Sequence, residues 1–226
     1  MPTADRREFM PAAVRMFLRQ RYHEKELLIL DDGCDDVSEL ILSCPDIRYF
    51  REPDRWQSLG EKRNRACELA LGEIILHWDD DDWYADWRIS YQVDTMVKGN
   101  FDLTGINRPF LIDARRKKAW EYPGRPNSPW VCGATLGYRK ALWARHRFLG
   151  LGVGEDSRFI YTASEIRVGA LKDNRCYVAR IHECNTATKA KPSEWLDRDF
   201  ASIVAMVGRD WPTYFGGPAG LPQTLR

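Results

Sequence analysis

Long hydrophobic runs and a surplus of one charge sign are both missing from this 226-residue sequence. No apolar stretch approaches the ~20 residues that span a bilayer, and no signal-peptide core stands near the amino terminus. We therefore expect a cytoplasmic protein. The sequence is also compatible with peripheral contact with a membrane. Lys and Arg number 34, Asp and Glu number 33, and the net charge of +1 gives no field that would attract nucleic acid. We expect no nucleic-acid partner.

Paired cysteines are also missing. The six cysteines include no Cys-x-x-Cys pair and no zinc-finger spacing, and most lie in or beside apolar segments. A free cysteine packs there as a small hydrophobic residue, so we expect neither disulfides nor a zinc site. Tryptophan, in contrast, is plentiful, with nine residues. Several flank polar motifs, where their rings suit a sugar-binding face or, equally well, the core.

Strands and helices are expected to alternate in the first half of the sequence, since apolar residues occur either at helical spacing or in short runs. We expect helices over residues 6–20, 36–42, 60–71 and 86–97, and strands over 26–30, 47–50 and 73–78. Gly72 is expected to cap the third helix. This alternation is typical of an α/β fold with a mixed, mostly parallel sheet flanked by helices.

The second half contains more Gly, Pro and Asn turns. Strands are expected over residues 101–113, 117–122, 131–138 and 176–181, and helices over 140–145, 155–163 and 193–207. A Gly/Pro tail, residues 208–226, is expected to be mobile. The length suits one domain, which we divide into halves of about residues 1–98 and about residues 99–200.

Four consecutive aspartates, Asp79 to Asp82, follow the apolar run Ile74-Ile75-Leu76. Two carboxylates about 5 Å apart repel by roughly 3 kcal/mol at an effective dielectric constant near 20. A divalent cation such as Mg²⁺ or Mn²⁺ would relieve that repulsion, because these ions take carboxylate and phosphate oxygens as ligands. A solvated acidic turn is the alternative. The position at the end of a predicted strand favours a binding site, since ligands of open α/β sheets bind there.

Seven motifs occur in a fixed order along the chain. They are Pro2-Thr3-Ala4-Asp5-Arg6, the strand ending in Asp31-Asp32-Gly33, Gly60-Glu61-Lys62-Arg63-Asn64, Gly72-Glu73-Ile74-Ile75, the aspartate cluster, Gly133-Ala134-Thr135-Leu136 and Gly154-Glu155-Asp156. This series, over roughly residues 1–190, resembles the family 2 glycosyltransferases, which have the GT-A fold. A single motif of this kind would be weak, but seven on the expected elements are specific.

The resemblance implies a nucleotide-sugar site in the first half. Asp32, with Asp31 beside it, would read the base, because a carboxylate accepts from the N–H of a uracil-like ring; an Asx turn is the alternative. Lys62 and Arg63 would hold phosphates or sugar hydroxyls, or else form a solvated helix face. The remaining residues assigned to donor binding are Pro2, Thr3, Arg6, Asp80, Trp130 and Gly133. Trp130 could equally belong to the core.

The resemblance also implies a divalent cation, Mn²⁺ or Mg²⁺, bound by the Asp-x-Asp motif. Asp79 and Asp81 match that motif, and Asp82 adjoins it. The cation would bridge the donor phosphates and neutralise the leaving nucleoside diphosphate. His182 follows the last predicted strand and is assigned as a further ligand, with a structural histidine as the alternative.

On the acceptor side, Asp156 is implied to be the catalytic base. It would take a proton from an acceptor hydroxyl as that oxygen attacks the anomeric carbon, with inversion in a single displacement. Glu155 would orient Asp156 or bind the acceptor. Both could instead be ordinary acids in the first turn of a helix, where they favour the macrodipole.

The chain departs from the family pattern in having Met1-Pro2 where a strand of about five residues is usual, so we expect the first strand to be short or missing. A second departure is Ala85, where a proline is usual. The best hypothesis is a metal-dependent inverting glycosyltransferase that moves a sugar from a nucleotide-diphosphate donor, first of all a UDP-sugar, to the hydroxyl of a glycan, lipid-linked or small-molecule acceptor. Because members of this family commonly act in polysaccharide biosynthesis, we expect the same role here.

Two hypotheses from other classes stay open. An inactive GT-A-like binding module would follow if the first strand were truly missing. A metal-dependent phosphohydrolase would need Asp-x-Asp-x-Thr, and Trp83 stands in the threonine position. A sugar nucleotidyltransferase is disfavoured because no Gly-rich phosphate loop occurs near the amino terminus.

Overall fold

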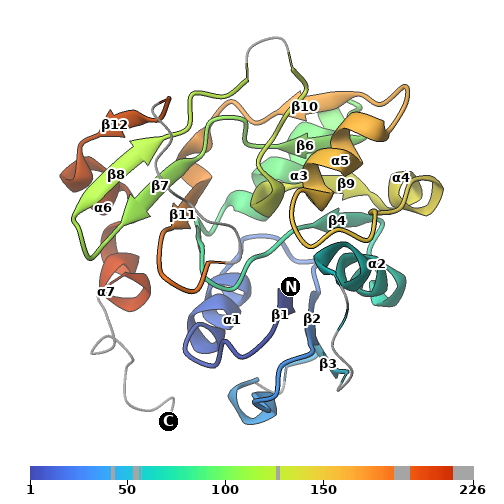
Figure 1. Ribbon diagram of the computed structural model, residues 1–226, viewed down its shortest axis with the longest axis horizontal. Coiled ribbons are helices and arrows are strands. Elements are labelled where there is room, and N and C mark those ends of the chain that lie inside the picture. Colours follow the sequence, from blue (N-terminus) through green and yellow to red (C-terminus); the bar gives the residue numbers. More distant parts are fainter. Residues whose placement is uncertain (42–43, 53–55, 57, 126–127, 186–193, 216–226) are drawn as a thin grey trace.

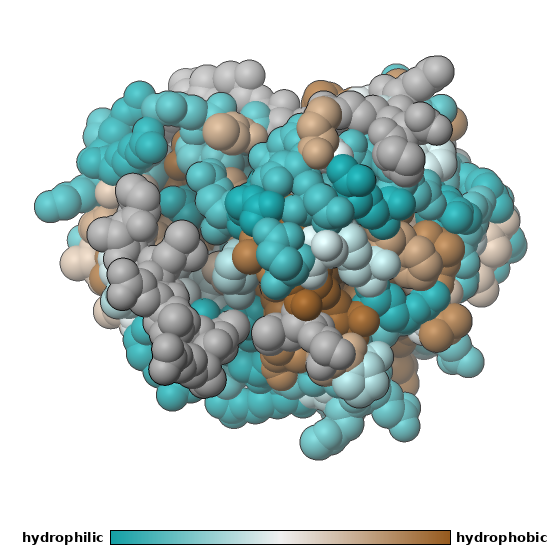
Figure 2. Space-filling model, turned by 90° about the horizontal axis from the view of Figure 1, so that it is seen from below, coloured by the Kyte–Doolittle hydropathy of each residue, from teal (hydrophilic) through white to brown (hydrophobic). Residues whose placement is uncertain are grey.

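The computed structural model describes residues 1–41, 44–52, 56, 58–125, 128–185 and 194–215. Its strands form three sheets that helices cover, so the mixed α/β architecture is as expected. In Figure 1 the first sheet lies below, the second to the right and the third to the left. Figure 2 shows hydrophilic residues surrounding a hydrophobic area near the middle of the lower face.

The first sheet is parallel and comes from the amino-terminal residues. β2 (Leu27–Asp31) pairs with β1 (Pro2–Thr3) on one side and with β3 (Ile47–Arg51) on the other. All five residues of β2 are buried, which explains its unbroken apolar run, because a parallel strand is covered on both faces. β1 has two residues, in agreement with the expected short first strand. Helix α1 (Met10–Leu18) carries Pro11 in its first turn, where the missing N–H costs little.

Helix α2 (Leu59–Leu69) begins after Ser58, whose side chain caps it. The Ser58 hydroxyl accepts from the Glu61 N–H, and the Ser58 hydroxyl donates to the Glu61 carboxylate. The prediction that Gly72 caps this helix is wrong. The chain leaves the helix at Ala70, which is extended, and the Glu26 carboxylate accepts from the N–H groups of residues 71 and 72.

The second sheet has the order β10-β6-β9-β4. Its strands are β4 (Ile74–Leu76), β6 (Leu103–Gly105), β9 (Gly137–Arg139) and β10 (Val168–Ala170). β10 and β6 are parallel, whereas β9 runs antiparallel to both of its neighbours. Three helices accompany this sheet: α3 (Arg88–Lys98), α4 (Lys140–Arg145) and α5 (Glu155–Thr162). The predicted bounds of α4 are confirmed.

The third sheet has the order β12-β8-β7-β11-β5. Its strands are β5 (Trp83–Tyr84), β7 (Phe110–Asp113), β8 (Lys118–Glu121), β11 (Tyr177–Arg180) and β12 (Leu196–Arg198). Only the β11–β7 pair is parallel. The first sheet is therefore wholly parallel, whereas the second and third sheets are mixed, in line with the predicted mixed sheet.

Several predicted elements were wrong in length or type. Residues 36–42 give only the 3₁₀ turn η1 (Ser38–Leu40), with 42 and 43 outside the described residues. The strand expected over 101–113 is two strands, because Pro109 between them has no N–H to donate to a ladder. Most of 131–138 is loop and the 3₁₀ turn η2 (Gly133–Thr135).

The end of the chain also differs from the prediction. Helix α6 (Phe200–Val207) starts later than expected because Asp199 caps it, accepting from the N–H groups of residues 201 and 202. Residues 208–215, predicted as tail, form η4 (Gly208–Asp210) and α7 (Trp211–Tyr214), and Tyr214 and Phe215 are buried in the main core. Residues 216–226 lie outside the described part.

Candidate functional site

The loops after β1, β4 and β11 meet at the aspartate cluster. The Thr3 hydroxyl donates to Asp80 Oδ2 over 2.6 Å. One nitrogen of Arg6, Nη1, donates to Asp80 Oδ1 over 3.0 Å and to Asp81 Oδ2 over 2.6 Å. The first motif and the fifth are thus joined by direct contacts, although more than 70 residues separate them.

Burial gives Asp80 an unusual acidity. Its side chain is 4 % exposed, and desolvation raises its pKa from 3.8 to about 6 even though the Arg6 guanidinium acts in the opposite direction. Asp80 is therefore partly protonated near neutral pH. A second cation beside it would favour the ionised form, as a metal bound at Asp81 would.

Asp81 and His182 form the pair that best fits a divalent cation. His182 Nε2 lies 2.9 Å from Asp81 Oδ2, and both side chains are about nine-tenths buried. The Asn185 side chain positions His182, since its Oδ1 accepts from the His182 backbone N–H over 2.8 Å. One carboxylate oxygen and one imidazole nitrogen at this spacing are suitable ligands, with phosphate oxygens completing the set.

The other two predicted metal ligands have different surroundings. Asp82 accepts from the Tyr177 hydroxyl over 2.5 Å and from the Arg180 N–H over 2.8 Å, so both of its oxygens hold β11. Asp79 is 31 % exposed, and its nearest cation is Arg63 Nη2 at 3.9 Å. Within the described part of the chain, no three acidic, histidine or cysteine side chains form a ready metal cluster.

The end of β2 supplies the residues assigned to the nucleotide base. Asp31 is engaged in local structure, since it accepts from the Gly33 N–H over 2.9 Å and from the Tyr49 hydroxyl over 2.7 Å. Asp32 forms a buried ion pair with Lys62, and its Oδ2 accepts from the Trp56 N–H over 3.3 Å. The Asx-turn alternative therefore describes Asp31, and Asp32 stays the candidate for the base.

Lys62 and Arg63 do not form a solvated helix face. Lys62 is 5 % and Arg63 is 6 % exposed, and both point from α2 into the site. The Lys62 ammonium also donates to the Thr3 carbonyl, which fixes the end of β1. Burial lowers the pKa of Lys62, and Asp32 opposes that shift.

Arg63 joins the two halves of the site. Its Nε donates to Glu155 Oε1 over 3.0 Å, its Nη1 lies 2.8 Å from His77 Nδ1, and its Nη2 lies 3.9 Å from Asp79 Oδ1. Burial alone would lower the pKa of Arg63, but Asp79 and Glu155 outweigh burial and raise it. The aspartate loop and the start of α5 therefore approach the same guanidinium.

The predicted acceptor-side acids lie in the first turn of α5. Glu155 is buried, which raises its pKa, and Arg63 partly offsets that shift. Asp156 is half-buried, and its Oδ1 accepts from the Ser157 N–H over 2.6 Å. A Cβ atom on Gly133 would come within 1.8 Å of Asp156 Oδ2, so only glycine leaves room for this carboxylate. The chain turns into α5 at Gly154, whose φ is +80°.

Trp130 lies in a different group of side chains. Its ring is 4.7 Å from the Tyr122 ring and 5.4 Å from the Arg125 guanidinium, and Arg125 also reaches Tyr161 of α5. Trp78 and Trp83, which could have belonged to a sugar-binding face, are buried in the main core. All six cysteines are free.

Sequence reasoning missed several residues that shape the site. His77 Nδ1 lies 2.7 Å from the Gly133 carbonyl oxygen, which accepts its proton, and the Tyr84 hydroxyl accepts from the Asp79 N–H over 2.8 Å. Arg88 is fully buried and stacks with the Trp78 and Tyr84 rings while donating to the His77 carbonyl over 2.8 Å. A histidine in an otherwise apolar strand was a visible signal, but nothing in the sequence marks Arg88.

Comparison with known proteins agrees with this geometry. The model of the family "Glycosyl transferase family 2" matches residues 1–147, more than half of the chain. An uncharacterized glycosyltransferase of Rickettsia felis is 32 % identical over 105 residues, 45 % of this chain and 17 % of that protein. The UDP-Glc:alpha-D-GlcNAc-diphosphoundecaprenol beta-1,3-glucosyltransferase WfgD of Escherichia coli is 28 % identical over 102 residues, 44 % of this chain and 40 % of that protein. The match thus spans less than half the length of these relatives.

A solved structure shows the same fold. TarS residues 1–349 of S. aureus, in complex with UDP-GlcNAc, superpose with a TM-score of 0.68 over 91 % of this chain and 63 % of that chain, at 20 % identity. The expected GT-A fold is thereby confirmed. Because the family model covers most of the chain and includes the motifs that meet at the aspartate loop, this protein belongs to glycosyl transferase family 2.

Proposed function

We propose that this protein is a metal-dependent inverting glycosyltransferase. It moves a sugar from a nucleotide-diphosphate donor, a UDP-sugar, to an acceptor hydroxyl. The observation that carries the proposal is the bridge made by Arg63, which places the aspartate loop beside Glu155 at the start of α5. A donor held at the aspartates would present its anomeric carbon toward Asp156.

Each half of the site has a separate task. Asp81 and His182 would hold Mn²⁺ or Mg²⁺, with Asp79 as the more exposed neighbouring oxygen donor. The cation supplies Lewis-acid stabilisation of the leaving diphosphate. Lys62 and Arg6 add fixed positive charge near the phosphates, and Thr3 keeps Asp80 in place. Asp82 is left out of this set because both of its oxygens hold β11.

Asp156 would act on the acceptor. Its carboxylate takes the proton of the acceptor hydroxyl as that oxygen forms the new bond to the anomeric carbon. The bond from that carbon to the diphosphate oxygen breaks in the same step, so the configuration inverts. Gly133 leaves Asp156 Oδ2 the space it occupies, and the Ser157 N–H fixes Oδ1.

Two observations bear on the identity of the donor and the acceptor. Asp32 is placed at a strand end where a carboxylate suits a uracil ring, and the name of the Escherichia coli relative specifies a UDP-sugar and a diphosphoundecaprenol-linked substrate. These points favour UDP and a lipid-linked acceptor over a soluble glycan. No helix in the described residues is long and apolar enough to cross a membrane, and a peripheral contact would bring such an acceptor to the site.

Calorimetric titration with UDP and then GDP, each with and without Mn²⁺, tests the donor half. We expect binding that needs Mn²⁺ and prefers UDP, and we expect Asp81→Ala to abolish it. Asp94→Ala is the matched control, because Asp94 is an exposed acid on α3 that pairs with Lys98 of the same helix. Absence of nucleotide binding in the parent protein would favour the non-catalytic GT-A-like binding module instead.

A further inference from the structure

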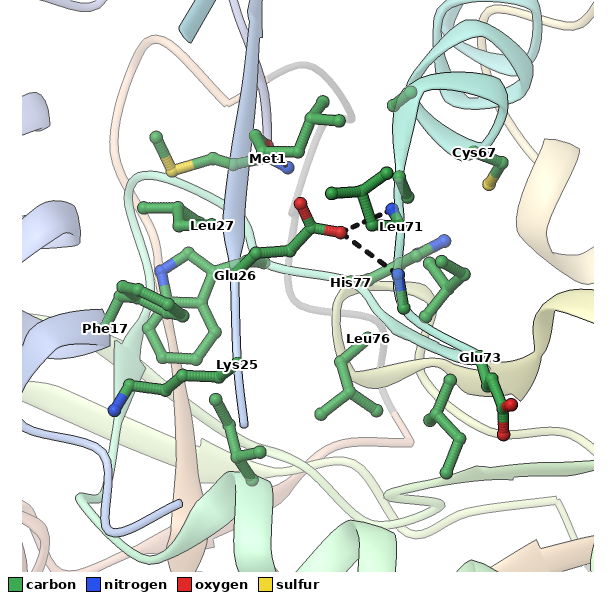
Figure 3. Close-up of a pocket in the computed structure, with 18 of the residues that line it drawn as sticks. Met1, Phe17, Lys25, Glu26, Leu27, Cys67, Leu71, Glu73, Leu76 and His77 are labelled. Carbon is green, nitrogen blue, oxygen red and sulfur yellow. Dashed lines mark hydrogen bonds between the residues drawn. The ribbon is translucent and has the colours of Figure 1, made fainter. Parts of the chain in front are cut away.

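A cavity of about 470 Å³ lies between the first sheet and the second (Figure 3). Figure 3 shows the Glu26 carboxylate reaching across it to the N–H groups of residues 71 and 72. The walls of the cavity are mainly apolar, and Asp156 is not among the residues that line them. An acceptor whose hydroxyl meets Asp156 therefore needs a different surface, beside α5.

Three aromatic side chains and one arginine form such a surface, which we call the aromatic cluster: Tyr122, Trp130, Tyr161 and Arg125. The Trp130 ring lies 4.7 Å from the Tyr122 ring, and the Arg125 guanidinium lies 5.4 Å from the centre of the Trp130 ring. Arg125 donates to the Tyr122 hydroxyl over 3.0 Å and to the Tyr161 hydroxyl over 3.3 Å. Tyr161 is 43 % exposed, Arg125 is exposed, and the other two rings are half-buried. The cluster therefore presents ring surface and a cation to solvent.

The backbone next to Trp130 is held in place against α5. The Cys132 N–H donates to the Ile106 carbonyl over 2.8 Å. Val131 is buried in a small hydrophobic core that it shares with Phe159 of α5. Because Trp130 directly precedes these anchored residues, its ring keeps a defined position relative to α5.

The aromatic cluster lies close to Asp156 along two stretches of chain. Tyr161 follows Asp156 by five residues on α5, a rise of roughly 7.5 Å along the helix. Trp130 precedes Gly133 by three residues, and a Cβ atom on Gly133 would lie 1.8 Å from Asp156 Oδ2. A saccharide bound at the cluster can therefore extend a hydroxyl to Asp156.

The charge of the cluster indicates an anionic ligand. The bonds of Arg125 go to two neutral hydroxyls, and among the described residues no carboxylate forms an ion pair with it. Arg158, three residues before Tyr161 on the surface of α5, is exposed as well. Guanidinium N–H groups match phosphate oxygens, and Trp and Tyr rings pack against the apolar body of a polar molecule. A sugar that carries a phosphate combines both features.

We propose that Trp130, Tyr161 and Arg125 form an acceptor subsite for a sugar that carries a phosphate at its anomeric carbon. The sugar ring packs against the aromatic side chains, and Arg125 binds the phosphate. The inference rests on the proposed glycosyltransferase function, because Asp156 would act on a hydroxyl of the same sugar. It names a diphosphate-linked sugar as the acceptor class, and it moves Trp130 from the donor side to the acceptor side.

The test titrates the protein with three probes: α-D-GlcNAc 1-phosphate, methyl α-D-GlcNAc and inorganic phosphate. Each titration is run without nucleotide and with UDP and Mn²⁺. We expect the sugar phosphate to bind at least about tenfold more tightly than either of the other probes. Arg125→Met should lower the affinity for the sugar phosphate about tenfold and change that for the methyl glycoside less than about twofold. Arg147→Met is the matched control and should change neither, because Arg147 lies over the Trp143 ring of α4 and pairs with Glu68.

A second pair of variants tests the ring. Trp130→Ala should lower the affinity for both sugars about fivefold, whereas Trp130→Phe, which keeps an aromatic face, should retain most of it. Equal binding of inorganic phosphate and the sugar phosphate, or an unchanged affinity in Arg125→Met, would overturn the proposal.

Two further outcomes would also overturn it. One is the absence of sugar-phosphate binding in both conditions. The other is displacement of the sugar phosphate by UDP and Mn²⁺, which would place it in the donor site. UDP binding by the parent protein is measured separately, so a failure of this subsite and a failure of the glycosyltransferase proposal give different results.

Discussion

The pair Asp80 and Asp81 after β4 and Asp156 at the start of α5 are carboxylates with opposite surroundings. The side chains of Asp80 and Asp81 are buried, and they are held by Thr3 and Arg6 from the amino-terminal segment and by His182 from the segment after β11. Asp156 is half-buried, and its contacts are a neighbouring backbone N–H and the Cα side of Gly133. The first arrangement suits fixed charge beside a diphosphate, and the second suits a carboxylate that receives a proton.

Arg63 is the point at which these two regions meet. A single guanidinium contacts Glu155, His77 and Asp79, so the aspartate loop and the start of α5 share one buried cation. Variants that change each region alone, and a variant of Arg63 that joins them, test whether the two regions are separate.

The largest effect is expected from Asp156→Asn. The amide keeps the size of the carboxylate but cannot take up a proton, so the transfer rate should fall by about 10²–10⁴-fold. UDP affinity with Mn²⁺ should stay within about twofold, because the diphosphate site is unchanged. Single-turnover transfer and calorimetry measure the two quantities. A parallel loss of both would mean that the two regions are not separate.

Removing the shared cation should affect both regions. Arg63→Met leaves Glu155 buried without its partner, which should lower the free energy of unfolding by about 3–5 kcal/mol. Denaturant titration measures this loss. Arg65→Met is the control, since Arg65 pairs with Glu52 and Glu68 on the exposed side of α2, and it should cost less than about 1 kcal/mol. Comparable losses in the two variants would contradict the role of Arg63.

A Cβ atom added at Gly133 should crowd Asp156 and give a smaller effect. Gly133→Ala would place a Cβ atom 1.8 Å from Asp156 Oδ2, and we expect a cost of about 1–3 kcal/mol in stability and reduced transfer. Gly152→Ala is the matched control, because nothing lies within 4 Å of its added Cβ. Thermal unfolding and transfer rates are measured for both variants. Equal values in the two variants would show that Asp156 moves away from the added Cβ atom without loss of stability.

The smallest effect is a pH dependence from Asp80. The pKa of Asp80 in the folded protein is about 6, against an ordinary value of 3.8. Between these values the folded state binds more protons than the unfolded state. The contribution of Asp80 to the free energy of unfolding therefore falls as the pH rises from about 4 to about 6. A cation at Asp81 favours ionised Asp80, so Mn²⁺-dependent UDP affinity should rise by up to about tenfold between pH 5 and 7. Asp80→Asn should flatten the profile in calorimetry. An unchanged profile in that variant would assign the dependence to another group.

Local sequence patterns were sufficient for much of the fold. The apolar run of β2 and the bounds of α4 follow from rules that involve only near neighbours. The order of motifs identified the family because the aspartate loop, the α2 start and the α5 start each have a short signature. Elements whose ends depend on distant contacts were predicted less well: β12 pairs with β8, about 75 residues earlier, and no local signal marks it.

The sequence by itself determined which residues stand at strand ends and helix starts, and therefore which acids and cations could form a site. Only the tertiary structure decided their partners: Asp82 turns to β11, Asp81 to Arg6 and His182, and Arg63 inward to Glu155. The physical reason is that four adjacent carboxylates are equivalent in local propensity. Desolvation and charge pairing with segments brought together by folding then give each one a different environment.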